Sequence, residues 1–82
     1  MSDEDIFRRV LDGRSVAFRD LERLLIRLGF TLVRTSGSHR IYRHPHVTRH
    51  INLQPVGKDA KPYQVRQLRD IIREFDLKLG RS

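Results

Sequence analysis

The sequence predicts an α+β domain, a two-layer sandwich in which helices cover one face of a three-stranded antiparallel sheet. Its 82 residues, none of them cysteine, are enough for a single small domain that packing alone must stabilise. Apolar residues recur with helical spacing toward both ends of the chain and with a period of two between them. A β meander flanked by two amphipathic helices closes as one sheet covered on one side and open to solvent on the other.

Three segments have the spacing of amphipathic helices. Residues 3–11 follow Ser2, which serves as an N-cap, and begin with acidic residues that favour a helix N-terminus. Residues 18–28 end at Gly29, a helix stop. The last helix begins at Pro62, whose missing N–H costs nothing at that position. The apolar stripe of the second helix is Leu21, Leu24, Leu25 and Leu28, and that of the last is Val65, Leu68, Ile71, Ile72, Phe75 and Leu79.

Between the helices the chain reads as three strands. The first begins with the alternation at Phe30, and the turn Ser36-Gly37-Ser38 follows it. The second covers about 39–43 and the third about 49–54. The predicted order is therefore α-α-β-β-β-α.

Alternation along the strands predicts which side chains face solvent. We expect Ile41, Ile51 and Leu53 to point toward the helices, because burying apolar side chains is favourable. Their neighbours then form an open polar face made of Arg40, Tyr42, His50, Asn52 and Gln54. The same alternation would place His39 inward, so the preceding turn is expected to redirect it.

The charge of the chain favours a polyanionic partner. The net charge is +7, and 14 of the 17 basic residues are arginine. Arginine binds phosphate bidentately and stacks on bases, whereas lysine acts mainly as a point charge. A genome rich in arginine codons is an alternative explanation of the arginine content.

No segment of the sequence indicates a membrane or a secretory route. No apolar run approaches the roughly 20 residues that span a bilayer, and the N-terminus is acidic without a signal-peptide core. The lack of cysteine fits a reducing compartment. We therefore expect a cytoplasmic protein that does not bind membranes.

Two stretches of the sequence resemble the HicA toxins, also called YcfA-like proteins. They are LGFTLVRTSGSHRIYRHP at 28–45 and KPYQVRQL at 61–68, and the likeness extends over about residues 16–77. Its centre is the triplet Gly37-Ser38-His39, between a helix ending in Gly-Phe and a strand ending in His-Pro. We thus expect one HicA-like domain with a core at 16–79. The extension 1–15 is either a helix packed on that core or a partner contact.

The resemblance implies a fold and an activity. The family has a double-stranded-RNA-binding-like α-β-β-β-α fold, and its members are mRNA interferases of type II toxin–antitoxin systems, which cleave mRNA and block translation. It implies that His39 is the catalytic residue and that a HicB-like antitoxin covers the active site. It assigns no role to the loop at 55–60.

Histidine suits metal-independent cleavage of single-stranded mRNA, in which the 2′-OH of the substrate is the nucleophile. Its unperturbed pKa of about 6.5 lies near working pH, so it can accept and donate protons. Arg40, Arg43 or Lys61 could stabilise charge on the phosphoryl group. Gly37 would let the backbone approach the phosphate, and Ser38 would orient His39 or donate a hydrogen bond. No cofactor is expected.

Several alternatives remain open at the level of the sequence. Tyr42 is either a base-stacking platform or a filler of the sheet. His44 and His50 are candidates for a second proton-transfer group. With His46 they raise the question of zinc, but no cysteine and no HExxH pattern accompanies them, so no metal site is predicted. The alternative function is a non-catalytic RNA-binding module of the same fold, in which His39 is only a contact.

Overall fold

The elements follow one another in the predicted order. The structure, a computed structural model, describes residues 1–80 and comprises α1 (Asp3–Leu11), α2 (Phe18–Arg27), β1 (Thr31–Ser36), β2 (His39–His44), β3 (Val47–Leu53) and α3 (Pro62–Phe75). The sheet is antiparallel, in the order β1-β2-β3. The predicted α+β class is confirmed, and the arrangement is compatible with a double-stranded-RNA-binding-like layout.

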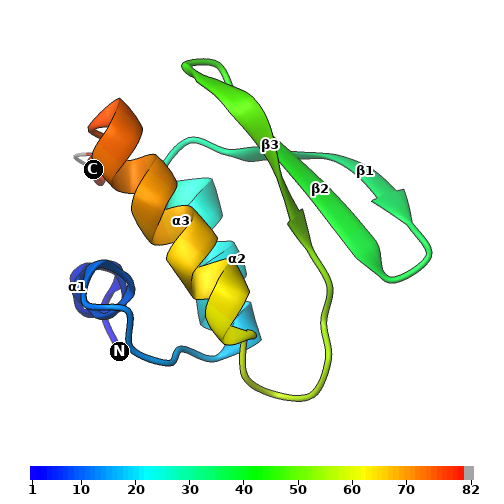
Figure 1. The fold of residues 1–82 in the computed structure, drawn as a ribbon, viewed down its shortest axis with the longest axis horizontal. Coiled ribbons are helices and arrows are strands. Elements are labelled where there is room, and N and C mark those ends of the chain that lie inside the picture. Colours follow the sequence, from blue (N-terminus) through cyan, green and yellow to red (C-terminus); the bar gives the residue numbers. More distant parts are fainter. Residues whose placement is uncertain (81–82) are drawn as a thin grey trace.

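The helices lie on one side of the sheet and leave its other face open (Figure 1). The core is formed by the apolar stripes of α2 and α3, by Ile6 and Val10 of α1, and by inward residues of β2 and β3. β1 is an edge strand, and all six of its residues are exposed. No helix within residues 1–80 has the length and apolar character needed to cross a bilayer.

The helix α1 packs on the side of α2 and α3 that faces away from the sheet (Figure 1). Its side chains Ile6 and Val10 are fully buried. Ser2 and Asp5 form a capping box at its start, as expected of a serine N-cap. Asp3 binds Arg23 at 2.8 Å and Arg27 at 2.9 Å, which ties the first turn of α1 to α2. The helix α1 is therefore packed against α2 and α3.

The prediction of which β2 side chains point inward is wrong. Tyr42 is buried opposite Ile51, and Ile41 pairs with Asn52 on the open face. In β3, however, Ile51 and Leu53 are buried as predicted. Alternation allows one of the adjacent residues Ile41 and Tyr42 to face the core, and the larger aromatic ring of Tyr42 fills that place.

A carboxylate on α2 explains how Tyr42 and Arg40 can face the helices. Arg40 Nη1 donates to both carboxylate oxygens of Glu22 at 2.7 Å, and the Tyr42 hydroxyl donates to Glu22 Oε2 at 2.6 Å. The Arg40 guanidinium also lies 5.8 Å from the ring centroid of Phe18. Burial, with the bond to Glu22, raises the pKa of Tyr42 well above its ordinary value, and the bond to Glu22 raises the pKa of Arg40. Arg40 and Tyr42 thus link the sheet to α2 and do not belong to the open face.

His44 fixes the β2–β3 hairpin to the end of α2. Its Nε2 donates to the carbonyl of Leu28 at 2.9 Å, and its Nδ1 accepts from the His46 amide at 3.0 Å. Gly29 has φ +101°, and a Cβ there would lie 3.0 Å from His44 Nε2. The His44 ring also packs against Phe30, with ring centroids 5.0 Å apart. The Gly-Phe and His-Pro ends of the motif are therefore in contact, which gives them a structural role.

We predict that Ile6→Ala lowers the free energy of unfolding by about 2–5 kcal/mol, because it leaves a cavity where α1 meets the other helices. Urea unfolding followed by circular dichroism measures the change. The control is Arg8→Ala, an exposed residue of the same helix, which should change stability by less than about 0.5 kcal/mol. Equal stability of Ile6→Ala and the unmodified protein would show that α1 is not part of the folded core.

We predict that Glu22→Ala lowers the free energy of unfolding by about 1–3 kcal/mol, because it leaves the buried Tyr42 hydroxyl without its acceptor. The cost should be smaller when Tyr42 is already phenylalanine, so a double-mutant cycle in urea isolates the bond. The control is Glu74→Ala, which removes the exposed pair with Arg49 and should cost less than about 1 kcal/mol. Additive effects of the two substitutions would contradict the proposed coupling.

Candidate functional site

The turn that carries the Gly-Ser-His motif determines where its histidine lies. Gly37 and Ser38 are the only residues between the paired Ser36 and His39. Gly37 has φ +60° and Ser38 has a negative φ, the pattern of a type II′ hairpin turn, which calls for glycine at its first central position. No atom lies within 4 Å of a Cβ placed on Gly37, so backbone conformation is what requires glycine there.

His39 is exposed at the start of β2 and lies on the open face of the sheet. It is two residues before Ile41, and both share that face with Asn52, so ordinary alternation turns His39 outward. The expectation that the turn must redirect this side chain is wrong. It followed from the mistaken inward placement of Ile41.

The His39 ring has one nitrogen held and one free. Its Nδ1 lies 3.1 Å from Asn52 Oδ1. Because an amide oxygen can only accept, Nδ1 carries a proton in this arrangement, and in the neutral ring Nε2 then keeps its lone pair. A histidine in that tautomer, on an exposed surface, can take a proton from a hydroxyl group at Nε2.

A hollow of about 320 Å³ lies beside His39, where α3 meets the edge of the open face. Its lining residues are His39, Asn52, Tyr63 and Gln67. Tyr63 and Gln67 are four residues apart on α3 and so share one side of that helix. Asn52 lies on the open face as predicted, whereas Tyr63 and Gln67 were not predicted to belong to the site. The spacing of the last two, flanking the buried residues Gln64 and Leu68, was the signal that could have grouped them.

A chain of hydrogen bonds joins the Gly-Ser-His turn to the first turn of α3. Ser38 Oγ accepts from Gln54 Nε2 at 3.2 Å, and the Gln54 carbonyl accepts from Gln64 Nε2 at 3.5 Å. The Gln64 side chain is fully buried and also accepts from the Lys61 amide at 3.2 Å. Ser38 therefore binds Gln54 rather than His39. The chain holds Lys61, at the N-cap of α3, in a fixed relation to the turn.

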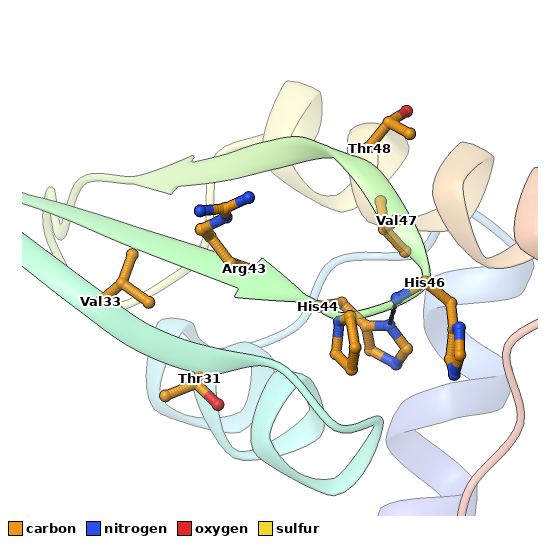
Figure 2. Close-up of a pocket in the computed structure, with 8 residues that line it drawn as sticks. Thr31, Val33, Arg43, His44, His46, Val47 and Thr48 are labelled. Atoms are coloured by element: carbon orange, nitrogen blue, oxygen red, sulfur yellow. Dashed lines mark hydrogen bonds between the residues drawn. The ribbon is translucent and has the colours of Figure 1, made fainter.

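The open face also carries cationic and hydroxyl groups. Arg34 pairs with Ile41, which places it on this face, and Arg43 is exposed there. Among residues 1–80 neither arginine forms an ion pair, unlike Arg40. Arg43 and Val33 project to the same side from neighbouring strands (Figure 2) and line a second hollow of about 590 Å³. Of the arginines predicted to contact phosphate, Arg43 is thus available on this face.

The other histidines do not join His39. Both ring nitrogens of His44 are hydrogen-bonded, and it stands at the far end of β2. His50 shares the open face with Asn52, but it is far from His39. It lies on β3 four residues before Gln54, the residue opposite His39, which is about 13 Å along the strand. No three side chains of the types that bind metal converge anywhere in the described chain, 1–80. His39 and Tyr63 are the ionisable groups that line the hollow.

Comparison with known proteins gives a family. No curated protein and no solved structure matched the chain. The family model described as the HicA toxin of bacterial toxin–antitoxin systems matches residues 18–77, which take in α2, the whole sheet and α3. Since that match covers most of the chain, including the motif around His39, the chain belongs to the HicA family, the toxins of bacterial toxin–antitoxin systems.

Proposed function

We propose that this HicA-family toxin is a metal-independent endoribonuclease that cleaves mRNA, with His39 as its catalytic residue. The proposal rests on the exposure and hydrogen bonding of the His39 imidazole. His39 is exposed on the open face, Asn52 holds its Nδ1, and its Nε2 is free beside a hollow large enough for part of a nucleotide. Cleavage of mRNA in the cytoplasm would block translation.

The reaction needs one proton acceptor at the ribose. Nε2 of His39 takes the proton of the 2′-OH, and the resulting oxygen attacks the adjacent phosphorus as the bond from phosphorus to the 5′-oxygen breaks. The products are a 2′,3′-cyclic phosphate and a 5′-hydroxyl, whose proton comes from the His39 imidazolium or from water. DNA lacks the 2′-OH and is therefore not cleaved.

Positive charge near the phosphorus lowers the barrier of this step. Arg43 is an exposed cation on the face that holds His39, but it stands four residues away along β2 and would contact a neighbouring phosphate. Lys61, at the N-cap of α3, is linked to the turn through Gln64 and Gln54. Arg40 contributes less in this proposal than the sequence suggested, because Glu22 engages its guanidinium. Gly37 sits in open space at the tip of the hairpin and leaves room for a phosphate beside the turn.

A single-stranded substrate fits this arrangement better than a duplex. In-line attack requires the ribose and phosphate to rotate into a geometry that a regular A-form helix does not offer. The hollow beside His39 lies between the sheet and α3 and would take a group that is splayed out of a stack.

We predict that His39→Ala abolishes cleavage of single-stranded RNA in EDTA, with a loss of at least about 100-fold, because no other base is available at the hollow. Gel analysis of a labelled oligonucleotide measures it. His50→Ala is the matched control, an exposed histidine of the same face that should retain activity. Equal cleavage by His39→Ala would refute the assigned role. RNA binding without cleavage by the unmodified protein would instead favour a non-catalytic RNA-binding module.

We also infer that the HicB-like antitoxin places acidic side chains over the open face. Arg34 and Arg43 have no carboxylate partner within residues 1–80, and a basic surface of this kind associates rapidly with an acidic protein. Covering this face would also cover His39.

We predict that Arg34→Glu with Arg43→Glu weakens binding of the cognate antitoxin by at least about tenfold and lowers its dependence on salt, because both substitutions oppose acidic groups. Surface plasmon resonance at two salt concentrations measures the change. The control is Arg8→Glu with Arg19→Glu, which alters the net charge equally at exposed helical positions. If both pairs of substitutions weaken binding equally, the antitoxin responds to net charge and not to this face.

A further inference from the structure

We propose that the hollow beside His39 is a nucleobase-binding subsite, in which the Tyr63 ring stacks on a base next to the cleaved phosphodiester. The inference rests on the proposed function and names the part of the RNA that the site holds. His39 and Tyr63 line the same hollow, so a base seated on Tyr63 belongs to a nucleotide adjoining the scissile phosphate.

The two tyrosines of the chain have different surroundings. Tyr42 is buried and its hydroxyl donates to Glu22, so it serves the fold. Tyr63 is 49% exposed in the first turn of α3, and its hydroxyl has no hydrogen-bond partner in the described part of the chain. The buried residues Gln64, Val65 and Leu68 hold α3 to the core without it. An aromatic ring that is half in solvent, and that neither the core nor a hydrogen bond requires, is available for a ligand.

Stacking on an exposed ring is a general way to hold single-stranded RNA. Every base has a π-face, so a tyrosine ring binds a splayed base whatever its identity. Two amides lie at the same hollow. Asn52 uses Oδ1 for His39 and keeps its Nδ2 donors, and the Gln67 side chain makes no hydrogen bond within residues 1–80. These amides can bond the polar edge of a base that stacks on Tyr63.

The size of the hollow agrees with one base rather than a larger ligand. Its volume of about 320 Å³ lies at the lower end of the range for small-molecule pockets. The broader hollow near Arg43 is lined by the imidazoles of His44 and His46 but by no tyrosine, phenylalanine or tryptophan, and both ring nitrogens of His44 are engaged in hydrogen bonds. The exposed tyrosine ring therefore lies in the hollow beside His39, where cleavage is proposed.

The test uses the full chain and a short RNA with a 2′-deoxy sugar at the cleaved nucleotide, which prevents reaction. An abasic site is moved through the oligonucleotide one position at a time, and dissociation constants are measured by fluorescence anisotropy. We expect Tyr63→Ala to weaken binding of intact RNA by at least about fivefold. The loss should disappear when the abasic site is at one particular position beside the cleaved bond. Tyr63→Phe, which keeps the ring, should bind within about twofold of the unmodified protein.

Ile26→Ala is the matched control, since it truncates an apolar side chain of similar exposure on α2 and should leave binding unchanged. Circular dichroism checks that each variant is folded. If the unmodified protein tolerates an abasic site equally well at every position, the subsite is refuted without any mutation. If Tyr63→Phe weakens binding as much as Tyr63→Ala does, stacking is also overturned, since the hydroxyl would then be the functional group.

The outcome is separable from that of the proposed function. Suppose that His39→Ala abolishes cleavage, while Tyr63→Ala changes neither kcat/KM nor the position of the cut. The enzyme assignment would then stand and the subsite would be rejected. Binding that depends on Tyr63 and on one base, in a protein that cleaves no RNA, would retain the subsite and reject the enzyme.

Discussion

The two-residue turn at Gly37 and Ser38 constrains the register of β2, and most of the site follows from that register. With Ser36 paired to His39, the tight turn sets the pairing of Thr35 with Arg40 and of Arg34 with Ile41, and the register shifts only beyond these pairs, between Leu32 and Arg34. A slip by one residue would move every β2 side chain to the opposite face of the sheet. His39 would then point toward the helices, and Tyr42 would lose its buried place opposite Ile51. The positive φ of Gly37 is what allows so short a connection.

As a result, one face of β2 anchors the strand to α2 and the other face is exposed to solvent. The inward residues each contact α2 or its end, Arg40 and Tyr42 through Glu22 and His44 through the Leu28 carbonyl. The outward residues His39 and Arg43 are exposed and available to a substrate. A strand of six residues can therefore be anchored to a helix by alternate side chains while the others form a surface. Substitutions on the two faces should be distinguishable by their effects on stability and on activity.

The site is assembled where β3, the turn and α3 meet. The buried Gln64 joins the start of α3 to Gln54, and Gln54 in turn binds Ser38. That connection sets Tyr63 and Gln67 beside His39 without any of them being buried. The family match begins at residue 18, so α1 lies outside it. Its buried residues add apolar packing to a domain close to the lower size limit for a stable core.

Features set by neighbouring residues were predictable from the sequence. The Ser2 cap, the start of α3 at Pro62 and the glycine turn at 36–38 depend on local backbone chemistry, and each is found where it was expected. The orientation of β2 was not predictable from alternation, because Ile41 and Tyr42 are adjacent and both can be buried. Glu22, twenty residues from Tyr42, provides the acceptor that makes the aromatic residue the better choice. The hollow beside His39 likewise unites residues from β2, β3 and α3, so only the packing of helix against sheet could bring Asn52, Tyr63 and Gln67 to it.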